Sequence, residues 1–385
     1  MNKHKKPLVI YIGIGAVVIL LNVVAWNSTA FCDAYIETVF PLWVNTYGRL
    51  TGLVPFSVGE IMLVLGVVLV GLAAMVWIVW LVARIINRRK RVACEPPVGC
   101  SRIICRICRG FYLFFAWTFL SVCFVMTLNC FILYHASTFS EVYFEQKHDV
   151  EYDLEDLIAV RNMVVEECNR LALEMDRDEN GAIIYDKDIG QMAIGCMQEL
   201  GKTCGHLDGF YPHPKPLYTS DFFCQQYMCG YYFPFSMEAN YNDVMYIMNK
   251  PSTMCHELAH LRGYIFEDEA NFISYLACIQ SEDIVFRYSG YLSVLNYLDN
   301  DFYKAVGRNR EAYMEQPLIS AQVIEDNVFV TEEEWERINS KALLDTETVD
   351  EVSDTLVDVT LKANGVEDGM ISYNRVVRLL LEYYR

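Results

Sequence analysis

Basic residues are scarce in the longer, C-terminal part of this chain of 385 residues. Residues 137–385 hold 19 Lys and Arg against 45 Asp and Glu, a net charge of −26. This deficit argues against nucleic acids and anionic lipids as partners of this part, and it permits basic or neutral peptides. The same part has no internal repeat and no low-complexity tract. It is long enough for its own core, so we expect one domain with a helical tail.

Charged residues are almost absent from three long apolar stretches, residues 8–26, 61–86 and 111–134. Each stretch is long enough to cross the hydrocarbon core of a bilayer as a helix. No small-residue cleavage site follows the first stretch closely, and two more apolar stretches come after it. We therefore expect an anchor rather than a signal peptide, and an α-helical membrane region over residues 1–136.

Positive charge in this membrane region is distributed unevenly between the loops. The loop after the first stretch has only Arg49, whereas the N-terminus carries Lys3, Lys5 and Lys6. The loop after the second stretch carries Arg84, Arg88, Arg89, Lys90, Arg91, Arg102, Arg106 and Arg109. Because positive loops stay in the cytoplasm, the pattern predicts a multi-pass plasma-membrane protein embedded in the lipid bilayer. The N-terminus is expected to be cytoplasmic and residues 137–385 extracytoplasmic.

The cysteine spacing in the second loop fits no common zinc pattern. These cysteines are Cys94, Cys100, Cys105 and Cys108. They are expected to be free thiols, with palmitoylation as the alternative. An oxidising exterior permits disulfides in the C-terminal part. The neighbours in sequence that we suspect of pairing are Cys196 with Cys204 and Cys224 with Cys229. Cys255 and Cys278 are interpreted as small buried residues.

The most informative stretch is His256-Glu257-Leu258-Ala259-His260, which is followed by Glu267-Asp-Glu-Ala-Asn271. On a helix, positions i and i+4 lie on one face. Two imidazoles placed in this way bind one Zn²⁺, and Glu257 reaches a metal-bound water. A catalytic zinc needs a third protein ligand. We predict Glu267, which shares a helix face with Asn271. Glu269 is the alternative, and the two cannot both bind the metal, because side chains at positions i and i+2 of a helix point apart.

The surroundings of this motif favour a helix. Pro251 suits a first turn and Gly263 suits a helix end. Other helices are predicted at residues 153–177, 189–200, 267–283, 291–306, 332–342 and 348–364, and from Ser372 onward. The segment Asp176–Gly181 opens like a calcium loop, but Lys187 stands where a bidentate Glu is needed, so a polar turn is expected.

An aromatic, β-prone region precedes the motif helix. Residues Phe222–Tyr246 are rich in Tyr and Phe and predict short strands. Within them, Ser236–Asn242 is our candidate for an edge strand that pairs with an extended substrate. The alternative is that these aromatic residues are simply part of the core.

The motif residues resemble a known pattern. His256-Glu257-x-x-His260 followed by Glu267-x-x-Ala270-Asn271 resembles the gluzincin pattern, in which the second helix supplies Glu-x-x-Ala-Asp. Asn271 stands where that pattern has Asp; a carboxamide accepts a ligand histidine's N–H but polarises the ring less. The gap between His260 and Glu267 is also shorter than in well-studied gluzincins. Phe266 occupies the place of the third histidine of the metzincin pattern.

Longer stretches resemble an uncharacterised family of bacterial membrane proteins over most of the chain. They are Phe233-Pro-Phe-Ser-Met-Glu-Ala-Asn240, Cys255-His-Glu-Leu-Ala-His-Leu-Arg-Gly263, Glu267-Asp-Glu-Ala-Asn-Phe-Ile-Ser-Tyr-Leu-Ala277 and the closing segment from Ser372. Together the two resemblances imply three membrane helices followed by a mainly α, α+β zincin-like metallopeptidase domain. They imply no substrate.

The predicted function is a membrane-anchored zinc metallopeptidase that hydrolyses extracytoplasmic peptides or proteins. His256, His260 and Glu267 bind Zn²⁺, and Glu257 is the general base. Tyr373, or else Arg375, is the candidate that stabilises the oxyanion. One alternative is a non-catalytic zincin-fold receptor or scaffold for an envelope protein, motivated by Asn271. The others are a closed structural zinc site and a histidine pair without metal.

Overall fold

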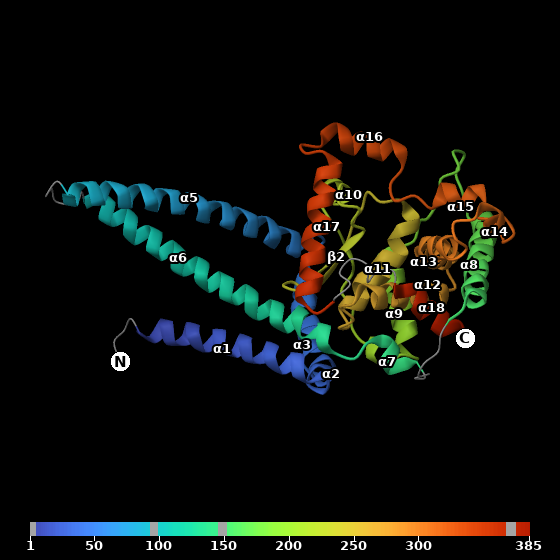
Figure 1. The fold of residues 1–385 in the computed structure, drawn as a ribbon, viewed down its shortest axis with the longest axis horizontal. Helices are drawn as coiled ribbons and strands as arrows, with labels where there is room; N and C mark the ends of the chain where they lie inside the picture. The colour runs from blue at the N-terminus through green and yellow to red at the C-terminus, as the bar shows by residue number, and fades with distance from the viewer. Residues whose placement is uncertain (1–4, 93–98, 145–151, 367–374) are drawn as a thin grey trace. The chain divides into compact units, whose positions relative to one another are not determined.

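The computed structural model describes residues 5–92, 99–144, 152–366 and 375–385, and these residues are mainly helical (Figure 1). They divide into two compact units. Unit 1 comprises Met1–Asn27 and Val58–Ile132, and unit 2 comprises Ser28–Ser57 and Leu133–Arg385. By packing, Ser28–Ser57 therefore belongs with the C-terminal part. The predicted boundary at residue 136 separates the membrane region from the extracytoplasmic domain, and it stays a prediction.

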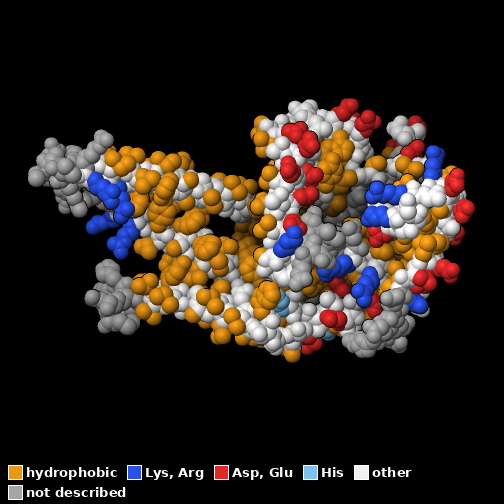
Figure 2. All heavy atoms as spheres, viewed as in Figure 1, with side chains coloured by type: hydrophobic (Ala, Val, Ile, Leu, Met, Phe, Trp, Pro, Cys, Tyr) orange, Lys and Arg blue, Asp and Glu red, His pale blue; other side chains and the backbone are white. Residues whose placement is uncertain are grey.

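Unit 1 contains the long apolar helices. They are α1 (Lys5–Asn27), α5 (Val58–Val92) and α6 (Gly99–Met126), the last continued by the π-helix η2 (Thr127–Phe131). Three spans are long and apolar enough to cross a membrane: Pro7–Asn27, Val58–Ile86 and Ile103–His135. Figure 2 shows hydrophobic side chains covering these helices, as expected of a membrane protein. The three predicted stretches are thus confirmed as helices, and their orientation stays a prediction.

One expectation for unit 1 is wrong. The cysteine-rich segment was expected to be a loop, but α6 begins at Gly99 and carries Cys100, Cys105 and Cys108. Its arginines are spaced among apolar residues, so the apolar helix continues through the segment. Cys94 lies outside the described residues.

Unit 2 is built around one central helix. Its helices are α2 (Thr29–Thr38), α3 (Phe40–Trp43), α4 (Arg49–Thr51), α7 (Phe139–Tyr143), α8 (Leu154–Glu174), α9 (Ile189–Gly201), α10 (Ser220–Cys224), α11 (Lys250–His260), α12 (Glu267–Ile279), α13 (Ile284–Ala305), α14 (Arg310–Met314), α15 (Ala321–Asp326), α16 (Glu332–Lys341), α17 (Thr346–Ala363) and α18 (Val376–Tyr384). Figure 1 shows α11 among α9, α12 and α13, and it packs against all three. Its residues Met254, Cys255, Leu258 and Ala259 are buried in these contacts.

The predicted helices of this part are found within a few residues of their expected ends, except that α13 begins well before residue 291. Side-chain caps explain several of the starts. Asp153 caps α8 in a capping box with Asp156, Asp188 caps α9, and Asp283 caps α13. The segment after α8 is a polar turn, as predicted, in which the Asp178 carboxylate accepts the N–H groups of Asn180 and Ala182.

A small sheet lies against α11. Its strands are β1 (Lys215–Pro216), β2 (Gly230–Phe233) and β3 (Glu238–Tyr241), in the order β1-β3-β2. β3 pairs in parallel with β1 and antiparallel with β2. The predicted edge strand Ser236–Asn242 is therefore wrong, because it contains the central strand β3. The edge strands are β1 and β2, and β2 packs on α11.

The suspected disulfides are not formed; Cys196, Cys204, Cys224 and Cys229 are free thiols. In the second pair, each sulfur atom has a hydrogen-bond partner of its own. The Cys224 thiol contacts the Asn242 amide, with Sγ–Nδ2 at 3.1 Å, whereas Cys229 hydrogen bonds to Thr253. Cys255 and Cys278 are buried and free, as predicted, with their sulfur atoms 3.8 Å apart.

Candidate metal centre

The motif helix α11 ends one turn before the helix that supplies the third candidate ligand. Pro251 occupies its first turn, where a missing N–H costs nothing. Gly263 has a φ of +95°, which lets the chain turn after His260. α12 then begins at Glu267, and Glu267, Asp268 and Glu269 lie in its positively polarised first turn. A short connection thus brings this acidic turn back to the two histidines.

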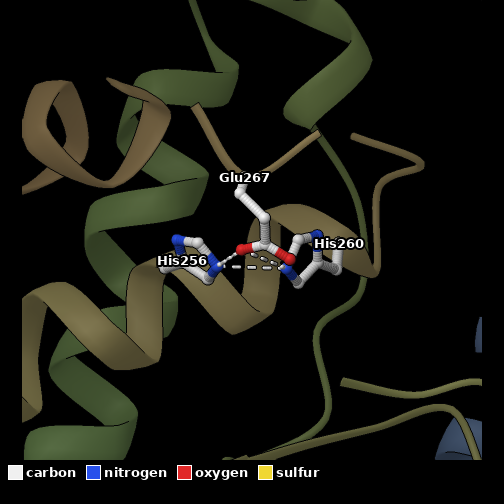
Figure 3. A group of neighbouring side chains, drawn as sticks. All are labelled: His256, His260 and Glu267. Carbon is white, nitrogen blue, oxygen red and sulfur yellow. Dashed lines mark hydrogen bonds and ion pairs between the residues drawn. The ribbon is translucent and has the colours of Figure 1, made fainter. Parts of the chain in front are cut away.

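Three side chains converge at this place (Figure 3). The Nε2 atoms of His256 and His260 are 3.1 Å apart, and Glu267 Oε2 lies 3.0 Å and 3.9 Å from them. All three ligand atoms lie within 4.8 Å of one another. A tetrahedral zinc ion with bonds of about 2.0–2.1 Å holds its ligands roughly 3.3 Å apart. The spacing of these atoms therefore fits zinc.

The other ring nitrogens hold the two imidazoles in the orientation that a metal needs. His256 Nδ1 lies 2.9 Å from Asn271 Oδ1, and His260 Nδ1 lies 2.7 Å from the Tyr264 carbonyl oxygen. Both partners are acceptors, so each Nδ1 carries a proton, and each Nε2 is the ring nitrogen that faces the other candidate ligands. Such bonds fix tautomer and ring angle in histidine metal sites.

Of the two carboxylates considered as third ligand, the structure brings only Glu267 to the histidines. Glu269 is buried and points elsewhere. It accepts the backbone N–H of Phe139, and the Ser140 hydroxyl at 3.1 Å. These partners precede it by about 130 residues and hold α7 on α12.

The protonation states also suit a cation. Burial lowers the pKa of His260 to about 4, so this imidazole is neutral near pH 7. Burial alone would raise the pKa of Glu267, but its hydrogen bond to His256 and the charges of both histidines outweigh that effect and lower it. Burial likewise lowers the pKa of His256, and Glu267 reverses this to a net rise. A cation that replaces the proton between His256 and Glu267 would balance the charge of the same Glu267 carboxylate.

Glu257 lies beside the three residues and is buried. Its Oε2 has no hydrogen-bond partner among the described residues. Burial raises its pKa to about 8; the charge of His256 opposes this and that of Glu267 adds to it. A carboxylate poised near neutral pH and free of hydrogen bonds at one oxygen can take up and release a proton.

Of the proposed oxyanion residues, Tyr373 lies outside the described residues, and Arg375 immediately precedes α18. Burial raises the pKa of Asp268, and the positive charge of Arg375 opposes this rise. Arg375 is therefore near the first turn of α12, which contains Asp268. The structure also brings in a residue that the sequence analysis missed, Tyr297 on α13. Burial raises its pKa, and the charges of Cys229 and Glu267 add to this rise. No local pattern marks Tyr297, because it lies 30 residues after Glu267 and only helix packing brings it near.

Gly230 in β2 is a point of close approach to the site. A Cβ atom there would lie 2.6 Å from Glu257 Oε1 and 2.8 Å from the Asn240 carbonyl oxygen. We expect Gly230→Ala to push β2 away from α11 and to destabilise unit 2 by about 1–3 kcal/mol. The thermal unfolding midpoint of the detergent-solubilised chain should therefore fall. Gly195→Ala is the matched control, because no atom lies within 4 Å of that Cβ position. Equal midpoints for the two variants would contradict the close approach.

Comparison with known proteins gives a family. Residues 35–381 match the model of a family described as "Protein of unknown function (DUF3810)". The searches of curated proteins and of solved structures found no match. The matched range includes all the candidate ligands and most of the apolar helices. The expected membership of an uncharacterised family is confirmed: the chain belongs to the DUF3810 family of proteins of unknown function.

Proposed function

We propose that this protein is a membrane-anchored zinc metallopeptidase whose zincin-like catalytic domain is unit 2. The observation that carries the proposal is the convergence of His256, His260 and Glu267 next to the buried Glu257. Three ligands leave a fourth position of a tetrahedral ion open, which distinguishes a catalytic site from a closed structural one. The distribution of basic residues supports a multi-pass plasma-membrane protein with this site outside the cytoplasm.

In the proposed reaction, His256, His260 and Glu267 hold the zinc ion. When bound, zinc supplies a water of lowered pKa and polarises the scissile carbonyl group. Glu257 takes the proton of the attacking water on its unpartnered oxygen and delivers it to the leaving amine. Tyr297 is our candidate for the hydroxyl that donates to the developing oxyanion.

The substrate is proposed to be an extended peptide bound along β2. Asn242 N donates to Cys229 O at 2.7 Å, and this register directs the N–H and C=O groups of Gly230 away from β3. Gly230 also lies close to Glu257, because a Cβ atom added to it would lie 2.6 Å from Glu257 Oε1. A peptide that pairs with this edge would therefore pass the general base.

A second candidate function is a non-catalytic receptor built on the same frame. It is favoured by Asn271, whose carboxamide oxygen lies 2.9 Å from His256 Nδ1. A carboxamide polarises the ring less than a carboxylate does, which weakens the electronic support of the ligand. The two candidates agree on metal binding and differ on hydrolysis.

The experiment that tests the proposal measures metal and cleavage on the same preparation. We expect the detergent-solubilised full-length chain to contain about one zinc ion and to cleave members of a random peptide library. A chelator should abolish cleavage, and added zinc should restore it. Zinc without cleavage of any peptide would favour the receptor. A folded chain that binds no zinc would contradict both candidates.

A further inference from the structure

The segment Ser28–Ser57 is tied to apolar helices at both ends. It follows the candidate span Pro7–Asn27 directly and is followed directly by the candidate span Val58–Ile86. Between them the chain is folded compactly into α2, α3, the π-helix η1 (Val44–Gly48) and α4. If the two neighbouring helices cross a bilayer, this segment has to lie at the bilayer surface.

One face of the segment exposes large apolar side chains. Leu42 is 61% exposed, Leu50 is 65% exposed and Leu53 is 80% exposed. They recur along the segment together with Val39 and Tyr47. Exposed apolar side chains gathered within one short segment mark a contact surface. Cys32, Tyr35, Phe40 and Val44 of the same segment are buried.

The polar groups of the segment are arranged as in an apolar environment. Thr38 Oγ1 donates to Ala34 O at 2.5 Å, Asn45 Nδ2 to Pro41 O at 2.8 Å, and Thr46 Oγ1 to Leu42 O at 2.6 Å. These exposed side chains thus satisfy their own donors without water.

Every charged side chain of the segment has a partner elsewhere in unit 2. Asp33 accepts from the N and Oγ atoms of Ser137, both at 2.8 Å. Glu37 lies 3.5 Å from His206, and the Arg49 guanidinium lies 3.9 Å from the centre of the Phe210 ring. The charged side chains of the segment are therefore paired with other residues of unit 2. The surface that carries Leu42, Leu50 and Leu53 stays apolar.

The buried side of the same segment touches the elements that carry the candidate metal centre. Ile36 lies against Gly263, whose N–H donates to His260 O at 3.0 Å. Thr51 Oγ1 donates to the Ser236 carbonyl oxygen at 3.0 Å, just before β3. The segment therefore packs directly against the turn that follows the motif helix and against the start of β3.

A buried ion pair holds the C-terminal end of the segment on the sheet. Lys215 Nζ donates to the carbonyl oxygens of Thr51 and Phe56 at 2.6 Å and 3.1 Å. It also pairs with Glu238 Oε1 at 2.5 Å. Both side chains of the pair are at most 5% exposed, and they lie in β1 and β3. The C-terminal end of the segment is therefore bonded directly to the sheet that lies against α11.

We propose that the apolar face of Ser28–Ser57 lies in the interface of the bilayer, and that the site takes membrane-proximal segments of proteins anchored in the same bilayer. This inference rests on the proposed function and adds its substrate class. An extended chain covers about 3.3–3.6 Å per residue, so a substrate anchored in the same bilayer needs only a short stretch of chain to reach a site that packs against this segment. A shared bilayer also raises the effective substrate concentration.

The test compares three forms of one random peptide library with the full-length chain in phosphatidylcholine vesicles. One form is free, one is joined to a double acyl anchor by about 4 flexible residues, and one by about 30. We expect the short-spacer form to be cleaved about twentyfold faster than the long-spacer form, because effective concentration falls as about the −3/2 power of linker length. Equal rates for the two anchored forms would overturn the inference.

Two matched double variants locate the effect. Leu50→Asn with Leu53→Asn should abolish the short-spacer preference and leave cleavage of the free library in detergent unchanged. Leu343→Asn with Leu344→Asn is the control, because both leucines are exposed but lie between α16 and α17. A preference that survives the first double variant would overturn the assignment of this face to the bilayer. Failure to cleave any probe, in detergent and in vesicles alike, would overturn the proposed function and this inference with it.

Discussion

Replacing Glu257 by Gln is expected to abolish peptide cleavage while the zinc content stays that of the unchanged chain. Glu257 is not among the three converging ligands, so the metal keeps its protein partners. Glutamine has nearly the same shape but cannot accept the proton of the attacking water. General acid–base catalysis contributes about 10²–10⁴-fold to such reactions, and the rate should fall by that factor.

The measurement is the cleavage rate of library peptides beside zinc content by elemental analysis. Glu282→Gln is the matched control, because Glu282 is exposed between α12 and α13. That variant should cleave like the unchanged chain. Cleavage at an undiminished rate by Glu257→Gln would remove Glu257 from the mechanism.

Replacing Glu267 by Ala is expected to remove the bound zinc, whereas replacing Glu269 by Ala leaves it in place. Glu267 Oε2 lies 3.0 Å from His256 Nε2, and without it two imidazoles remain in the described site. Structural and catalytic zinc sites hold the ion with at least three protein ligands. Zinc per chain after dialysis against a weak chelator measures the difference.

Glu269→Ala has a different effect, and this makes the pair informative. It removes the acceptor of the Phe139 N–H and of the Ser140 hydroxyl. Leaving such groups unsatisfied should destabilise unit 2 by about 1–3 kcal/mol, visible as a lower thermal midpoint. Zinc that is lost with Glu269→Ala and kept with Glu267→Ala would reverse the ligand assignment.

Much of the fold was predictable because its signals are local. The three apolar helices follow from runs of uncharged residues, and α8, α9 and α11 follow from helical periodicity and from Asp or Pro at their starts. The candidate ligands were predictable for the same reason. The four-residue spacing of His256 and His260 places them on one helix face, and Glu267 and Asn271 repeat that spacing on α12.

The sequence by itself therefore determined the apolar helices, the motif helix and the set of candidate ligands, because each depends on residues a few positions apart. Only the tertiary structure decided that β3 is the central strand, since strand order depends on pairing between β1, β2 and β3. It also decided that Glu269 bonds to α7 and that Ser28–Ser57 packs with the C-terminal part. These outcomes depend on contacts between positions up to about two hundred residues apart, for which no local pattern exists.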